Sequence, residues 1–160
     1  RGNLFAAILL PGRLSFVWME AWCPGSTWNP RSSSVVIEGD YELYMGRDTY
    51  PSIGGCYYAS RLATAEFMLR IGKQAVAIVL REIYPGFNIP IGVWFVRENV
   101  RAMYRSKPAI FDNLREALHE LDKHSRLDST TWLQHSKLLK RALFEKRLLD
   151  FMENSTGYHR

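Results

Sequence analysis

The feature that constrains the fold most is a short, unbroken apolar run near the middle of the chain. Residues 75–80 (AVAIVL) carry six apolar side chains in succession, between Gly72 and the turn-forming sequence Tyr84-Pro85-Gly86. This run is too short and too uniformly apolar for a surface helix, so it predicts a buried strand. We therefore expect Ile78 and Leu80 to be core residues.

Three segments upstream predict the rest of a small sheet. Residues 4–10 are apolar and stop at Pro11-Gly12, and residues 14–22 alternate large apolar side chains with others. Together these two segments predict a pair of antiparallel strands. Residues 35–37 predict another short strand, and residues 40–55 an ordered loop rich in tyrosine. About four strands are therefore expected.

Apolar side chains at helical spacing predict four helices. The first begins after Gly54-Gly55 and ends at Gly72. Its apolar face is predicted to consist of Tyr58, Leu62, Ala65 and Leu69. Further helices are predicted at residues 91–105, 111–123 and 130–152, the last with Ser129 or Thr130 as its N-cap.

The order of these elements predicts a mixed α/β or α+β domain. Residues 1–128 are expected to form a core of about four strands with packed helices, and residues 129–160 a helical C-terminal arm and tail. The first residues, Arg1-Gly2-Asn3, lack an initiating methionine, so we expect a piece of a longer protein.

The charge of the chain is unevenly distributed. The net charge is +5, but residues 1–56 hold four arginines and five acidic residues, so the positive excess lies in residues 57–160. This favours a polyanionic partner, nucleic acid first, although a mildly basic soluble protein has the same composition. No apolar run reaches membrane-spanning length. We expect a cytoplasmic, nucleoid-associated protein with no membrane partner.

The cysteines and histidines predict no metal site. Cys23 and Cys56 form no Cys-x-x-Cys pair, and no histidine lies at ligand spacing from either. We interpret both cysteines as free thiols in a reducing compartment, although a disulfide between them is the alternative.

A row of cations on the predicted 91–105 helix is the strongest candidate for nucleic-acid binding. Trp94, Arg97, Arg101 and Arg105 share one face at spacings of three and four residues. Such a face suits phosphates and a stacked base. The alternative is a solvated basic face in which Glu98 pairs with Arg101.

We expect the cations of this helix to contribute more to nucleic-acid binding than those of the last one. Arg97 and Arg101 lie beside Trp94 on a helix predicted to be packed, whereas Lys137 and Lys140 belong to a longer helix predicted to be more exposed.

A second candidate site involves carboxylates. Arg81-Glu82 ends the buried strand, and strand ends are common site positions. Together with Arg97-Glu98 and Glu66 it could form one polar cluster, in which two carboxylates hold Mg²⁺ for phosphodiester chemistry. The favoured alternative is a structural salt-bridge network. Glu66, Glu82 and Glu98 are thus weak catalytic candidates, and no cofactor beyond this Mg²⁺ is expected.

The glycine pair is a weaker signal for a phosphate site. Free N–H groups at a helix start after Gly54-Gly55 can bind an anion, although such a pair more often only allows a tight turn. The Lys-Ser/Thr of a phosphate-binding P-loop is missing. We include Gly54, Gly55, Arg61 and Arg81 among the candidate nucleic-acid-binding residues.

The segment near the C-terminus resembles a sliding-clamp-binding peptide. Such peptides have the form Gln-x-x-aliphatic-x-x-aromatic-aromatic, whose apolar residues form a plug for a pocket. Here Leu148, Phe151 and Met152 fit the plug, while Glu145 replaces the glutamine and Met152 the second aromatic residue. The alternative is a last amphipathic helical turn folded on the core.

Several segments, in this order and spacing, resemble the C-terminal domain of the archaeal Nre family of DNA-repair proteins. They are residues 2–6 with 10–12, 22–28, 54–63, 80–83, 90–94, 96–101 and 111–114. The resemblance implies a role in DNA repair with the sliding clamp, PCNA, as a partner, and it favours the clamp interpretation above. It also implies a zinc-type cysteine cluster, but only in an N-terminal part that this chain lacks.

We therefore expect a DNA-repair factor that binds DNA and is recruited by PCNA. The alternatives are a metal-dependent, nuclease-like enzyme acting on nucleic acid and a pure interaction scaffold.

Overall fold

The computed structural model describes residues 2–87 and 92–144, which form one four-stranded sheet covered by helices. The strands are β1 (Asn3–Pro11), β2 (Ser15–Trp22), β3 (Val36–Glu42) and β4 (Ala75–Ile83), in the spatial order β1-β4-β2-β3. The sheet is mixed, because β4 runs antiparallel to β1 and parallel to β2. The predicted class, a mixed sheet of about four strands with packed helices, is confirmed.

The last strand in sequence lies in the middle of the sheet. β1 and β2 run in opposite directions, as predicted, but they are not hydrogen-bonded neighbours because β4 lies between them. The uniform apolar sequence of β4 suits this place, since a central strand is covered on both faces. The side chains of Ile78 and Leu80 are buried, which confirms their prediction as core residues.

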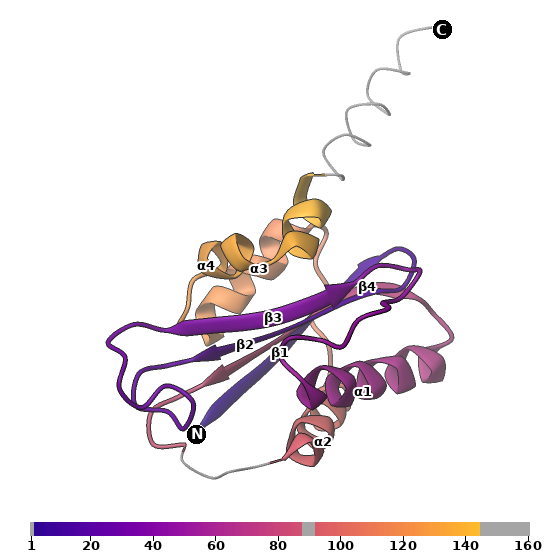
Figure 1. Cartoon of the computed structure of the whole chain (residues 1–160). Coiled ribbons are helices and arrows are strands. Elements are labelled where there is room, and N and C mark those ends of the chain that lie inside the picture. Colours follow the sequence, from indigo (N-terminus) through magenta and orange to yellow (C-terminus); the bar gives the residue numbers. More distant parts are fainter. Residues whose placement is uncertain (1, 88–91, 145–160) are drawn as a thin grey trace, which may run out of the picture.

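The helices cover both faces of the sheet, as Figure 1 shows. The first face carries α1 (Gly55–Ile71) and α2 (Val93–Met103). The second face carries α3 (Leu114–His124), α4 (Ser129–His135) and a helical stretch over residues 137–144, which we call the C-terminal helical stretch. Alternating residues of each strand face the two layers, which gives the domain two hydrophobic clusters.

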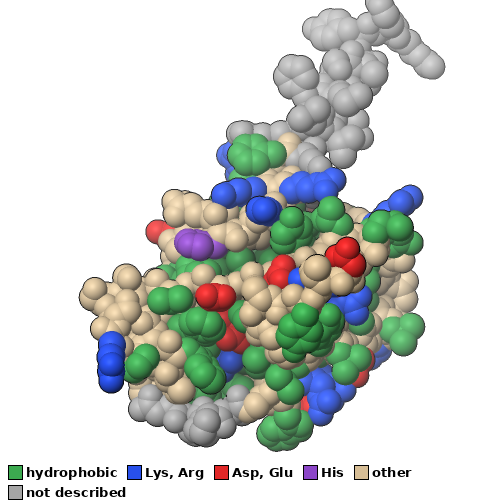
Figure 2. All heavy atoms as spheres, viewed as in Figure 1, with side chains coloured by type: hydrophobic (Ala, Val, Ile, Leu, Met, Phe, Trp, Pro, Cys, Tyr) green, Lys and Arg blue, Asp and Glu red, His purple; other side chains and the backbone are tan. Residues whose placement is uncertain are grey.

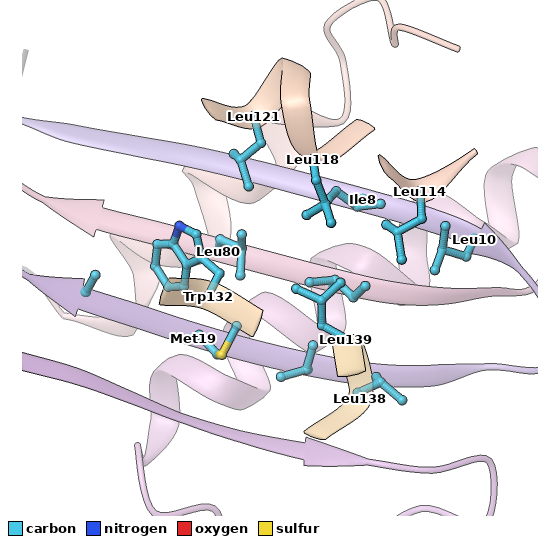
Figure 3. Packing of buried hydrophobic residues seen from close by; sticks show 13 residues of the cluster. Ile8, Leu10, Met19, Leu80, Leu114, Leu118, Leu121, Trp132, Leu138 and Leu139 are labelled. Carbon is cyan, nitrogen blue, oxygen red and sulfur yellow. The ribbon is translucent and has the colours of Figure 1, made fainter. Parts of the chain in front are cut away.

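The cluster under α3 and α4 extends into the predicted arm. Figure 3 shows leucines of α3 above β1, with Trp132, Leu138 and Leu139 over β4 and β2. These three side chains are buried, so the packed core reaches at least Leu139, beyond the boundary predicted at residue 128.

The single helix predicted over residues 130–152 is interrupted at Ser136. The Ser136 hydroxyl accepts a hydrogen bond from the Leu139 N–H, and the Asp128 side chain accepts one from the Thr131 N–H. Both are N-capping contacts, which satisfy donors at the start of a helix. The predicted N-cap, Ser129 or Thr130, was therefore wrong by one or two residues.

The apolar face predicted for α1 was also wrong. The helix buries Tyr57, Ser60, Ala63, Thr64 and Met68, whereas Leu69 is 84% exposed. The cause is that α1 is apolar on nearly all sides, so its periodicity does not define one face. Packing selected a side on which Ser60, Ala63 and Thr64 lie between the larger Tyr57 and Met68, and this side is buried in the cluster shared with the sheet and α2.

Candidate nucleic-acid interface

The arginine row of α2 lies on the surface, but its central member is fully engaged. Arg101 donates from Nε and Nη2 to the two carboxylate oxygens of Glu66, at 2.8 and 2.6 Å. Its Nη1 donates to Glu98 at 2.7 Å, and Glu98 also accepts from Arg97 Nε at 3.3 Å. Since Glu66 belongs to α1, these contacts join the two helices side by side.

The electrostatics of this network fit ion pairing. Hydrogen bonds from Arg101 hold the pKa of Glu66 below its ordinary value. Desolvation opposes the same change at Glu98, but the hydrogen bonds from Arg101 and Arg97 outweigh it and lower the pKa of that carboxyl too. Both glutamates are therefore charged at neutral pH, with their oxygens turned toward arginine, as the alternative salt-bridge interpretation expects.

Beside this network lies a shallow hollow of about 150 Å³ between the C-terminal halves of α1 and α2. Arg70 and Arg105 line it with Arg101, over the rings of Phe67 and Tyr104, which stack at 4.4 Å between centroids. The Arg70 guanidinium lies 5.4 Å from the Phe67 ring centroid and donates to the backbone carbonyl of Tyr104. Within the described residues Arg105 has no carboxylate partner.

Sequence analysis missed Arg70. The spacing of the sequence could have indicated it, because Arg70 follows Glu66 by four residues and so lies on the same face of the helix. What the sequence did not provide is the position of α2, which brings Arg70 close to Arg105.

The outer end of the row is exposed. Trp94 is 64% exposed at the start of α2, and the side chain of Arg97 is about one-third exposed. The row thus offers an aromatic ring and two incompletely engaged cations, Arg97 and Arg105, on either side of a neutralised Arg101. This geometry suits contacts to successive phosphates, with the ring available for stacking.

Arg81 is not part of this surface. It is buried on the α1 and α2 face of the sheet, where its Nη1 donates to Glu20 at 3.2 Å and its Nε to the Asn3 side chain at 2.8 Å. Its guanidinium also lies within 6 Å of the ring centroids of Phe5, Phe87 and Phe95. Arg81 therefore acts as a buried anchor between strands β1, β2 and β4.

Glu82 lies on the opposite face of the sheet, under the α3–α4 connection. Its carboxylate accepts hydrogen bonds from the hydroxyls of Tyr84 and Ser125 and from the backbone N–H groups of Arg126 and Leu127. The structure therefore separates Glu82 from Glu66 and Glu98. In the described part of the chain, no three His, Cys, Asp or Glu side chains gather in a way that could hold a metal ion.

The glycine pair serves the packing of two helix starts. Gly54 has a positive φ of 72°, which glycine adopts readily. A Cβ at Gly55 would lie 2.8 Å from Cγ1 of Val93, so the absence of a side chain lets α1 and α2 begin side by side. Arg61, farther along α1, pairs with the buried carboxylate of Glu42 at the end of β3.

A second basic surface lies on the C-terminal helical stretch. Figure 2 shows Lys and Arg side chains gathered there, at the top of the view, whereas over α1 and α2 such side chains lie beside acidic ones. Lys137 lies 6.0 Å from the ring centroid of Tyr41, and Lys140 donates to the Gln134 carbonyl. Both surfaces therefore have to be compared in any binding experiment.

The clamp-like segment and its residues Glu145, Leu148, Phe151 and Met152 lie outside the described residues. The two cysteines are described and are free, with Cys23 buried. Burial is the main cause that raises the pKa of the Cys56 thiol, to about 11, so this thiol is protonated at neutral pH. No described helix has the length and apolar content that a membrane crossing requires.

Comparison with known protein families identifies the family to which this chain belongs. Residues 42–151 match the family model described as archaeal Nre, C-terminal, and residues 1–29 match that described as archaeal Nre, N-terminal. The chain belongs to the archaeal Nre family. Its predicted membership is confirmed, but the assignment of the whole chain to the C-terminal domain is corrected for residues 1–29.

Three relatives bear names that refer to repair. The Nre chain is 55% identical to DNA repair protein NreB of Archaeoglobus fulgidus over 94% of its own length. It is 34% identical to DNA repair protein NreA of the same organism and 35% identical to NreA of Haloferax volcanii, over 82% and 77% of its length. It spans only 38%, 32% and 30% of these three relatives. No solved structure matches the chain.

The boundary between the two family models is not a boundary in this Nre fold. Strands β1 and β2 come from the segment matched by the N-terminal model, and β4 from the segment matched by the C-terminal one. Because β4 lies between β1 and β2, each segment completes the sheet of the other.

Proposed function

We propose that this Nre chain is part of a DNA-repair factor that binds DNA without strong sequence preference and is recruited by the sliding clamp. The observation that carries the repair role is that relatives up to 55% identical are named DNA repair proteins. The arginine row of α2 supports DNA as the ligand, and the resemblance of residues 145–152 to clamp-binding peptides supports the clamp.

The proposed DNA contacts divide by role. Arg97 and Arg105 contact phosphates, and Arg70 contributes from the neighbouring helix. Arg101 positions these groups, because its three nitrogens hold Glu66 and Glu98 and thereby fix α2 against α1. Trp94 stacks on an exposed base. Phosphate contacts of this kind carry no sequence information, so binding should depend little on sequence.

The first experiment measures salt dependence. Fluorescence anisotropy of a labelled duplex and of a single strand gives the binding constant at several salt concentrations. The logarithm of that constant should fall with the logarithm of salt, with a slope of about −0.9 per phosphate contact on duplex DNA. Binding that is absent at low salt, or independent of salt, overturns the proposed DNA binding.

The second experiment locates the surface. Replacing Arg97 and Arg105 by alanine together should remove about two phosphate contacts and make the slope less steep by roughly 1.8. The matched control replaces Lys137 and Lys140, which removes the same charge from the other basic surface. Equal losses from both double variants contradict the assignment to α2, and a larger loss in the control moves the DNA surface to the C-terminal helical stretch.

The third experiment tests the clamp. A three-residue plug buries a few hundred Å² of apolar surface, worth roughly several kcal/mol at about 25 cal/mol per Å² before ordering costs. We therefore expect micromolar binding. A peptide of residues 145–152 titrated calorimetrically into PCNA should bind, and its Phe151→Ala counterpart should not. Absence of binding by both the peptide and the whole chain ends the clamp proposal.

A further inference from the structure

The two edges of the sheet differ sharply in charge. Edge strand β3 carries three acidic side chains in seven residues, Glu38, Asp40 and Glu42. Edge strand β1 (NLFAAILLP) has nine residues and no charged side chain. Proteins normally protect an open edge with charges, bulges or shortness, because a long apolar edge pairs with other strands. β3 has such protection, whereas β1 has the composition of a strand that is paired on both sides.

The register shows which backbone groups of β1 face this edge. Tyr84 N–H donates to the Gly2 carbonyl at 3.0 Å, while Asn3 lies opposite Ile83, whose carbonyl turns to β2 and accepts from Cys23 N–H. In an antiparallel pair, hydrogen-bonded and non-hydrogen-bonded residues alternate. The even-numbered residues of β1 therefore bond to β4. The N–H and C=O groups that point away from β4 are those of Asn3, Phe5, Ala7 and Leu9, with the C=O of Pro11.

The outward groups are self-complementary about Ala7. If two copies of β1 lie antiparallel with Ala7 opposite Ala7, Phe5 faces Leu9 and Asn3 faces Pro11 of the other copy. Every outward N–H then meets an outward C=O, and the missing donor of Pro11 falls at the end of the ladder. The smallest side chains meet at the two-fold axis, and no like charges face each other.

The surroundings of the edge are apolar as well. β1 contacts α2 on one face of the sheet and α3 on the other. Trp94 on α2 is 64% exposed, and Ile110, four residues ahead of α3, is 91% exposed. Exposed apolar side chains therefore lie on α2 and just ahead of α3, the two helices that flank β1.

We propose that this Nre chain forms a two-fold homodimer in which β1 pairs antiparallel with β1 of a second copy. The two four-stranded sheets become one continuous sheet. An isologous contact of this kind closes on itself, so it yields a dimer rather than a filament. The proposal does not depend on DNA or clamp binding.

Light scattering after size-exclusion chromatography tests the oligomeric state. The 160-residue chain, of 18.5 kDa, should have twice that mass and return toward it on dilution. Ala7→Pro removes one outward N–H and no bond to β4, so it should give a folded monomer. Ala7→Ser keeps the N–H and should remain dimeric. A monomeric wild-type chain, or a dimer that survives Ala7→Pro, overturns the proposal.

Amide hydrogen exchange, measured on the unsubstituted chain at two protein concentrations, tests the same pairing even if the Ala7→Pro variant does not fold. The amides of Leu4, Ala6 and Ile8 should be protected at every concentration. Those of Phe5, Ala7 and Leu9 exchange from the monomer, whose fraction falls by about tenfold when the total concentration of a mostly dimeric chain rises hundredfold. Their exchange should slow by that factor. Equal exchange at both concentrations contradicts the pairing.

Discussion

Replacement of Glu82 by alanine is the most informative perturbation of this domain. The carboxylate is buried at the end of the central strand and accepts four hydrogen bonds, from Tyr84, Ser125, Arg126 and Leu127. Three of these donors belong to the connection between α3 and α4. Glu82 therefore holds the second helical layer against the sheet, and its truncation tests this structural role against the role of a metal ligand.

The expected cost follows from the donors that lose their acceptor. A hydrogen bond to a charged group contributes about 1.5–3 kcal/mol, and a buried donor left unpaired costs about 1–3 kcal/mol. The Arg126 backbone N–H is fixed and donates to Glu82 at 3.0 Å, so it loses its acceptor. The Leu127 N–H also donates to the Ser125 hydroxyl at 3.2 Å, and the hydroxyls of Tyr84 and Ser125 can turn to other acceptors. We therefore expect Glu82→Ala to lower the free energy of unfolding by about 2–4 kcal/mol, a large part of the roughly 5–15 kcal/mol of an ordinary domain.

Urea denaturation at one fixed protein concentration measures this cost. Glu82→Gln keeps one carbonyl acceptor and should cost less than alanine, and Glu38→Gln on the exposed edge of β3 should stay within about 0.5 kcal/mol of the unsubstituted chain. A loss below about 1 kcal/mol for Glu82→Ala refutes the argument. So does a stabilisation of the unsubstituted chain by Mg²⁺ that disappears in the variant, because that result assigns Glu82 to a metal site.

Three further outcomes are expected from the same folded domain. Arg101 holds the pKa values of Glu66 and Glu98 below their ordinary value of 4.5, so their pairing stabilises the fold above that pH and is lost as pH falls through the lowered values. Arg101→Ala should therefore reduce the melting temperature at pH 7 but progressively less in acid. An unchanged difference from pH 7 to pH 3 contradicts the network. Leu80→Ala should cost about 2–5 kcal/mol in urea denaturation, because the side chain is 2% exposed, and no effect would refute its burial. Gly55→Ala should destabilise by roughly 1–3 kcal/mol despite the better helix propensity of alanine, since its Cβ meets Val93 at 2.8 Å; a gain in stability would show that α2 yields easily.

The sequence predicted the elements that have one strongly periodic or uniform pattern. The run at residues 75–80 predicted β4, and the helical spacing over residues 91–105 predicted α2, which buries Val96 and Val100. The spacing over residues 111–123 likewise predicted α3, which buries Leu114, Leu118 and Leu121. These patterns suffice because burial of one face is a local property of each segment, readable from spacing alone.

Only part of the candidate site could be predicted from the sequence. Spacing predicted the surface row Trp94, Arg97 and Arg101 and the pairing of Glu98 with Arg101, since both depend on one helix. Arg105, predicted on the same helix, instead lies in a turn two residues past the end of α2 at Met103. Glu66 was predicted in a polar cluster, but that cluster also included Arg81 and Glu82. The structure distributes the three groups over two faces of the sheet, because adjacent strand residues point in opposite directions.

By itself, then, the sequence determined that this chain forms a small mixed sheet with packed helices, a basic second half and an Nre-type pattern. Tertiary structure alone decided that β4 lies between β1 and β2, which face of the evenly apolar α1 is buried, and that Arg70 joins the arginine row. The physical reason is the same in each case. The neighbours of a strand and the buried face of a helix depend on the total surface that segments distant in sequence bury against one another. The spacing of residues within one segment does not contain this information.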